Sequence, residues 1–177
     1  MKRWMMLFGL ACLAAACGNE QEVVFYSVTY PVVRLGAYVT LAAQPVDPEA
    51  PDDADADDTE AREQALAAEV LAEAPVEAGG SYRLDYSRYN GGTLTVIPAA
   101  GAGAIAGEFV KEPGSAQLEM AYDQHVYTCD ISSYTSDDGI RCVLLTVDLT
   151  EIYQARYPDA GILRVQRSEY TATPVNQ

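Results

Sequence analysis

Apolar and polar side chains alternate along most of the chain after residue 22, which is the pattern of β-strands with one buried face. The clearest run is 81–87, where Tyr82, Leu84 and Tyr86 alternate with polar residues. Asn90 and the glycines after it favour a tight turn, because Asn and Gly tolerate positive φ. Further strands are expected at 93–97, 105–111, 117–122, 125–131, 140–149 and 162–171, and a short helix at 150–157.

The alternation changes phase near Pro31. Apolar residues occupy even positions from Val24 to Tyr30 and odd positions from Val33 to Leu41. Successive side chains of a strand point to opposite faces, so the buried face must switch at this point. Proline cannot donate to a strand ladder, which favours a bulge, an edge or a crossing between sheets. We therefore expect two strands, at 23–30 and 33–42, with a kink between them.

An acidic segment interrupts the β pattern. Residues 45–63 include nine acidic residues, three prolines and one base. Such a segment cannot bury apolar surface, so we expect a flexible acidic loop at 44–58. The spacing Asp53-x-Asp55-x-Asp57 matches the start of a calcium loop, but the glycine and the final glutamate of such a loop are absent. No metal site is expected.

The stretch at 58–74 is rich in alanine and glutamate and has high helix propensity. Leu66, Val70 and Ala74 recur every four residues and form a narrow apolar stripe, and Pro75 follows them. We expect a helix over 58–74 that packs this stripe against its own domain.

About eight short strands and one alanine-rich helix fit a single β-rich domain over 23–177. Short alternating strands separated by turn signals are typical of all-β folds with two packed sheets. The predicted fold is an antiparallel β-sandwich, immunoglobulin-like or transthyretin-like in outline.

The N-terminal residues have the features of an export signal. Lys2 and Arg3 precede an apolar run, Trp4–Ala16, which is shorter than the roughly 20 residues that span a bilayer. Cys17 follows, and the segment resembles the lipobox of bacterial lipoproteins, although Leu13 lies four residues before the cysteine rather than three. The resemblance implies that signal peptide 1–16 is removed, that Cys17 carries fatty-acyl chains such as palmitate, and that 17–22 is a tether. A plain signal peptide cut near Ala16 and an uncleaved anchor are the alternatives.

Two cysteines remain beyond the N-terminal segment, and export favours a disulfide between them. If Ile131 faces Ile140 across the loop between them, Cys129 lies opposite Cys142. The register places Asp130 opposite Arg141 in the same way. We therefore predict a structural disulfide between Cys129 and Cys142.

The charge of the chain limits its partners. The formal charge is −15, and loss of Lys2 and Arg3 with the signal would lower it to −17. Nucleic acids are bound through Lys and Arg that neutralise phosphate, so no nucleic-acid partner is expected.

No catalytic constellation can be assembled from the sequence. His125 is the only histidine, and neither a nucleophile-elbow motif nor a zinc-ligand set accompanies it. Gly101, Gly103 and Gly107 lack the lysine of a phosphate loop. Four acids on the expected strands alternate with apolar residues as solvated faces do, although a carboxylate-based hydrolase stays an alternative: Asp85, Glu108, Glu119 and Asp148. Six tyrosines are candidates for a sugar-stacking surface: Tyr82, Tyr86, Tyr89, Tyr122, Tyr127 and Tyr134.

The signal, the acidic start of the mature chain and the small β-domain together resemble short envelope lipoproteins of the Bacteroidales, in stretches such as 89–96. This resemblance implies attachment to the outer membrane and transfers no catalytic residue. We expect a lipid-anchored, non-catalytic structural or interaction module without a cofactor, whose partner beyond the membrane is a protein or a glycan. A carbohydrate-binding accessory lipoprotein is the alternative.

Overall fold

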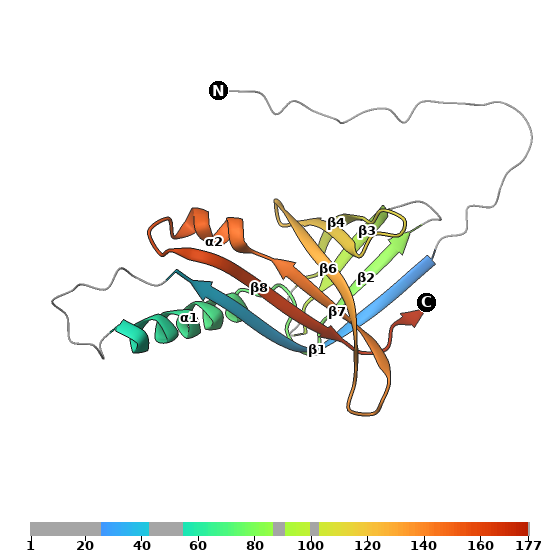
Figure 1. Cartoon of the computed structure of the whole chain (residues 1–177). Helices are drawn as coiled ribbons and strands as arrows, with labels where there is room; N and C mark the ends of the chain where they lie inside the picture. The colour runs from blue at the N-terminus through green and yellow to red at the C-terminus, as the bar shows by residue number, and fades with distance from the viewer. Residues whose placement is uncertain (1–25, 43–54, 87–90, 100–102, 177) are drawn as a thin grey trace, which may run out of the picture.

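The computed structural model describes residues 26–42, 55–86, 91–99 and 103–176 (Figure 1). Within these ranges the chain forms nine strands and two helices. In chain order they are β1 (Tyr26–Leu41), α1 (Asp55–Ala72), β2 (Ser81–Tyr86), β3 (Gly91–Ile97), β4 (Ile105–Val110), β5 (Gln117–Tyr122), β6 (His125–Thr135), β7 (Arg141–Asp148), α2 (Thr150–Arg156), β8 (Ile162–Thr171) and β9 (Val175–Asn176).

Strands β1 to β8 close into an eight-stranded antiparallel barrel. Each strand from β2 to β7 pairs with the next in sequence, and β1 pairs with both β2 and β8. The predicted β-sandwich is therefore wrong. A sandwich and a barrel show the same alternation of buried and exposed residues, and they differ in whether the strands form two separate packed sheets or one sheet that closes on itself.

Closure of the barrel depends on the unusual length of β1. Its first part, Tyr26–Pro31, pairs with β2, and its second part, Val32–Leu41, pairs with β8. A register shift between Val32 and Arg34 joins the two parts. The phase change near Pro31 is thus a bulge within one bent strand rather than a break between two strands.

The barrel interior is filled from alternate positions of every strand. Leu94 on β3 lies between Leu84 on β2 and Gly107 on β4. A side chain at Gly107 would collide with the backbone oxygen of Ala121, so β4 and β5 approach each other closely here. Leu94 is fully buried beside this glycine.

Helices α1 and α2 lie at the same end of the barrel (Figure 1), which we call the helical end. Helix α1 occupies the region where a helix over 58–74 was expected, and its Val70 is fully buried in the core. The carboxylate of Glu63 accepts a hydrogen bond of 2.8 Å from the backbone N–H of Leu41. Arg156 of α2 forms 2.8 Å ion pairs with Glu69 and Glu73, so α1 is joined to α2 as well as to β1.

The predicted disulfide is wrong, because the register of β6 and β7 differs from the expected one. Cys129 lies opposite Val147 and Cys142 lies opposite Tyr134. Five residues of β6 therefore separate Cys129 from the partner of Cys142, or about 17 Å at about 3.3 Å per residue. Both cysteines are free and buried. Cys129 faces the interior and Cys142 faces outward, a geometry that a disulfide cannot bridge.

The remaining strands agree well with the alternation pattern. The strands expected at 117–122 and 162–171 are confirmed with these bounds, while β6 extends four residues further than expected. Strand β9, which pairs with Val28 and Thr29, has no counterpart among the expected elements. No helix in the described ranges is both long enough and apolar enough to cross a membrane. Cys17 and the first part of the acidic segment lie outside the described residues.

Candidate functional site

A cavity of about 520 Å³ occupies the end of the barrel opposite the helices. We call it the open-end cavity. Its wall is formed by residues of the seven strands β1 to β7 and of the β4–β5 connection, and nearly all of them are apolar or aromatic. The lining residues are Tyr30, Tyr82, Leu84, Tyr86, Gly91, Phe109, Lys111, Pro113, Leu118, Met120, Ile131, Val143 and Leu145.

Aromatic rings shape the mouth of this cavity. Tyr26 stacks on Tyr86 with ring centroids 5.6 Å apart, and Tyr86 meets Phe109 edge-on at 6.2 Å. Lys111 is the one charged residue of the wall, and its ammonium group donates a 2.9 Å hydrogen bond to the backbone oxygen of Ser115. Burial raises the pKa of Tyr30, so this wall stays neutral apart from Lys111.

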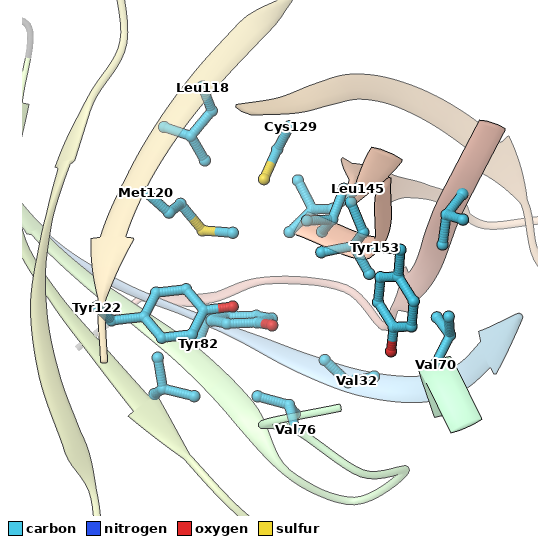
Figure 2. Packing of buried hydrophobic residues seen from close by; sticks show 14 of the residues in the cluster. Val32, Val70, Val76, Tyr82, Leu118, Met120, Tyr122, Cys129, Leu145 and Tyr153 are labelled. Carbon is cyan, nitrogen blue, oxygen red and sulfur yellow. The ribbon is translucent and has the colours of Figure 1, made fainter. Parts of the chain in front are cut away.

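The inner end of the cavity meets a polar layer, formed by Tyr82, Tyr122, Arg167 and Glu169. Arg167 and Glu169 are 3% and 0% exposed, and the Arg167 Nε donates a 2.7 Å hydrogen bond to Oε1 of Glu169. Both point inward because they share the face of Val165 on β8. Figure 2 shows the side chains of Tyr82 and Tyr122 next to each other, beside Met120 of the apolar core.

The electrostatics of the polar layer keep its tyrosines neutral and its arginine charged. Burial raises the pKa of both tyrosines, and the carboxylate of Glu169 raises it further. Burial alone would lower the pKa of Arg167, but Glu169 and the two tyrosines offset this effect, and the pKa ends above its ordinary value. The layer therefore presents one compensated charge pair and two hydroxyl groups.

Four atoms of this layer have no hydrogen-bond partner among the described residues: Nη2 of Arg167, Oε2 of Glu169 and the hydroxyls of Tyr82 and Tyr122. A buried polar group without a partner costs about 1–3 kcal/mol. Tyr82 lies beside Glu169 and Tyr122 beside Arg167, so the four groups form one polar layer whose hydrogen bonds a water molecule or a polar ligand can complete.

A second cavity, of about 380 Å³, lies on the other side of the polar layer, and we call it the helical-end pocket. Helices α1 and α2, the β5–β6 hairpin and Arg167 of β8 form its wall. The lining residues are Val70, Glu73, Pro75, Tyr122, Asp123, His125, Tyr127, Leu149, Ile152, Tyr153, Arg156 and Arg167.

The residues singled out from the sequence are dispersed over the barrel. His125 is exposed at the start of β6 and lines the helical-end pocket. The four acids alternate with inward-facing residues, and none lines either cavity: Asp85 pairs with Arg83, and Asp148 accepts a 2.9 Å hydrogen bond from the backbone N–H of Thr150, while Glu108 and Glu119 are exposed.

The tyrosines do not form one stacking surface. Tyr82, Tyr86, Tyr122 and Tyr127 point into the barrel, whereas Tyr134 lies outside it and donates a 2.7 Å hydrogen bond to the backbone oxygen of Thr171. Tyr122 and Tyr127 do stack, with centroids 4.6 Å apart. Tyr89, Gly101 and Cys17 lie outside the described residues.

A reactive thiol and a metal centre are two further kinds of site that cysteine, histidine and acidic side chains can form. Burial raises the pKa of the Cys129 thiol, which keeps it protonated and unreactive. In the described ranges, no three His, Cys, Asp or Glu side chains gather in a metal-binding group.

Arg167 and Glu169 are the residues that sequence reasoning missed. Charged side chains on a strand normally point to solvent, so their alternation with Gln166, Ser168 and Tyr170 carried no obvious meaning. The available signal was the alternation itself: Arg167 and Glu169 lie two and four residues after Val165, so they share the face of this apolar residue.

Comparisons of this chain with protein-family models, with curated proteins and with solved structures found no match.

Proposed function

We propose that this barrel is a non-catalytic binding domain that takes up a small apolar molecule in the open-end cavity. The observation that carries the proposal is a cavity of about 520 Å³ whose wall is apolar and aromatic except for Lys111. Ligand sites are usually preformed cavities of roughly 300–1,000 Å³ with this kind of lining. An eight-stranded barrel is just wide enough to hold one such ligand.

The wall also indicates how the ligand would be held. The apolar part of the ligand would lie against Leu84, Leu118 and Met120, which would remove apolar surface of both the ligand and the protein from water. Any polar substituent would lie at the mouth, where Lys111 and the hydroxyls of the tyrosine residues provide hydrogen bonds. The expected ligand is therefore neutral or weakly acidic and mostly hydrocarbon or aromatic.

A neutral environment-sensitive dye such as Nile red tests the proposal. The wild-type protein should bind one dye molecule with a blue-shifted emission. Leu84→Trp places a larger side chain in the cavity and should weaken binding at least about tenfold, which corresponds to about 1.4 kcal/mol. Val143→Trp, which enters the same cavity from β7, should act likewise.

Leu163→Trp is the matched control, because Leu163 is exposed on the outer face of β8. It should bind the dye as the wild type does. If both cavity variants keep the wild-type melting temperature and the wild-type dye affinity, the open-end cavity is not the binding site and the proposal fails.

We further propose that the barrel is anchored to the cell envelope through a lipid on Cys17. Strand β1 begins at Tyr26, whose ring stacks on Tyr86 at the mouth of the open-end cavity. Nine residues reach from Cys17 to the start of β1, and a chain extends at most about 3.5 Å per residue. The tether would thus hold the mouth within about 30 Å of the membrane, where apolar ligands concentrate.

Cys17→Ala is expected to abolish labelling with radioactive palmitate and to move the protein from the membrane fraction to the soluble fraction. Dye binding by this variant should stay at the wild-type level, because Cys17 is not part of the cavity. Unchanged labelling of the Cys17→Ala protein would contradict the anchor while leaving the binding proposal intact.

A further inference from the structure

The helical-end pocket has a different chemical character from the open-end cavity. Its inner wall carries Arg167 and Tyr122, which are 3% and 4% exposed, and its outer wall carries the exposed residues His125 and Arg156. The polar layer separates it from the open-end cavity, with which it shares no lining residue. It is therefore a second, independent place where a small molecule can enter the fold.

Two buried groups of this pocket are available for hydrogen bonding. Nη2 of Arg167 can donate, while the Tyr122 hydroxyl can donate and accept, and neither has a partner among the described residues. The Nε of the same guanidinium is already engaged by Glu169, which fixes the direction in which Nη2 points. A ligand with an oxygen acceptor at the floor of the pocket would satisfy both groups at once.

The charges around the pocket favour a neutral ligand over an anion. The charge of Arg167 is compensated by Glu169, and that of Arg156 by Glu73 and Glu69. Asp123 adds a further carboxylate at the mouth, and the whole chain has a charge of −15. A carboxylate or phosphate entering here would meet no net positive charge.

An aromatic wall completes the pocket. The rings of Tyr122 and Tyr127 stack at 4.6 Å, and the ring of His125 lies 6.0 Å from that of Tyr127. Flat aromatic faces beside hydrogen-bonding groups suit a small ring whose edge carries hydroxyls and whose faces are less polar. We infer that the helical-end pocket binds a neutral monosaccharide unit, with a sugar hydroxyl contacting Arg167 and Tyr122 and the sugar ring lying along the His125–Tyr127 wall.

This inference does not depend on the apolar ligand of the open-end cavity. Tyr122 and Tyr127 are two of the tyrosines that the sequence offers as candidates for sugar stacking. The basis of the proposal is the buried hydroxyl of Tyr122 rather than an exposed aromatic surface. A negative result at one site does not affect the proposal for the other, because the residues substituted at each site belong to the wall of only one of the two cavities.

Titration of the full chain with the methyl α-glycosides of glucose, galactose and mannose, followed by saturation-transfer NMR, tests the inference. At least one of them should bind saturably, with one molecule per chain. Glucuronate, which has the size of glucose but carries a carboxylate, should bind more weakly than the best neutral glycoside. Saturable binding of none of the three, or tighter binding of glucuronate, would overturn the inference.

Tyr122→Phe removes the hydroxyl and keeps the ring, so it should weaken glycoside binding about tenfold, the loss expected for one hydrogen bond. Its melting temperature should be unchanged or higher, since the hydroxyl has no protein partner. His125→Ala, at an exposed position, should weaken binding several-fold without changing the fold. Wild-type affinity in both variants would overturn the inference.

Tyr134→Phe is the matched control. This tyrosine is outside both cavities and donates a hydrogen bond to Thr171, so its variant should melt at a lower temperature and bind glycosides as the wild type does. The two Tyr→Phe variants should therefore show opposite patterns of stability and binding. A loss of glycoside binding in Tyr134→Phe equal to that in Tyr122→Phe would assign the effect to the fold rather than to the pocket.

Discussion

Replacing Glu169 with glutamine is expected to lower the free energy of unfolding by about 3–5 kcal/mol, because it leaves the charge of Arg167 buried and unpaired. Glu169 is fully buried, and its carboxylate is the partner of the Arg167 Nε at 2.7 Å. Glutamine keeps the size of the side chain, so the loss reports on charge rather than on packing. Urea denaturation followed by circular dichroism measures it.

The chain contains a matched control for this substitution. Arg83 and Asp85 on β2 repeat the arrangement of Arg167 and Glu169, with an Arg Nε bound to a carboxylate two residues later at 3.0 Å, but on the outer face with side chains 40% and 34% exposed. Asp85→Asn should therefore cost less than about 1 kcal/mol. Equal losses in Glu169→Gln and Asp85→Asn would contradict the view that Glu169 compensates a buried charge.

A double substitution separates the cost of a lone charge from the value of the pair. Arg167→Met combined with Glu169→Leu removes both charges and fills the same space with apolar groups. Replacement of a buried ion pair in this way is often neutral or stabilising. The double variant should thus recover most of the stability that Glu169→Gln loses, and should lose glycoside binding at the helical end.

Leu94→Ala is expected to destabilise the barrel by about 2–5 kcal/mol, the usual range for a buried leucine. Leu94 is fully buried and lies opposite Gly107, which contributes no side chain to that part of the interior. Strand β4 already approaches β5 closely at Gly107, so the backbone has little freedom to move in and fill the cavity that alanine leaves. The loss of stability in Leu94→Ala should therefore fall in the upper part of the 2–5 kcal/mol range, at about 4–5 kcal/mol.

Leu163→Ala on the outer face of β8 is the control for Leu94→Ala. Leu163 is 60% exposed, and its truncation should change stability by no more than about 0.5 kcal/mol. Thermal unfolding of the two variants side by side makes the comparison. Near-equal losses would show that Leu94 does not occupy a well-packed interior position.

Alternation in the sequence was sufficient to find the strands but not to arrange them. The strands at 117–122 and 162–171 have the expected bounds, because period-two patterning is a local property. Barrel closure depends on hydrogen bonds between β1 and β8, which lie far apart in the chain, and no local pattern reports it. The phase change at Pro31 was visible in the sequence, but its meaning as the bulge that redirects β1 from β2 to β8 required the structure.

The β6–β7 hairpin shows why a plausible register can fail. The expected register brought two cysteines and an ion pair together, so two independent features seemed to agree. The actual hairpin turns closer to Ile140: β6 continues to Thr135, and the backbone N–H of Ser136 bonds to the oxygen of Ile140. A short loop with Gly139 at positive φ replaced the longer loop of the prediction.

The candidate sites could be predicted only in part. His125, Tyr122 and Tyr127 were recognised as residues with suitable chemistry, but their meeting at the helical end depends on the β5–β6 register and on helix α2. Arg167 and Glu169 were not recognised, since a charged pair facing a barrel interior looks in sequence like an exposed one. Arg83 and Asp85 demonstrate the ambiguity, because the same spacing faces solvent there.

The double pairing of β1 has a consequence for how the chain reaches its folded state. Val39 pairs with Val165, 126 residues later, so the first strand to leave the ribosome receives its second partner almost last. Contacts of such high sequence separation slow folding, and an unpaired strand edge invites pairing with other chains in the meantime. A C-terminal truncation before Ile162, which removes β8, would leave the second part of β1 unpaired and turn a closed barrel into a sheet prone to aggregation.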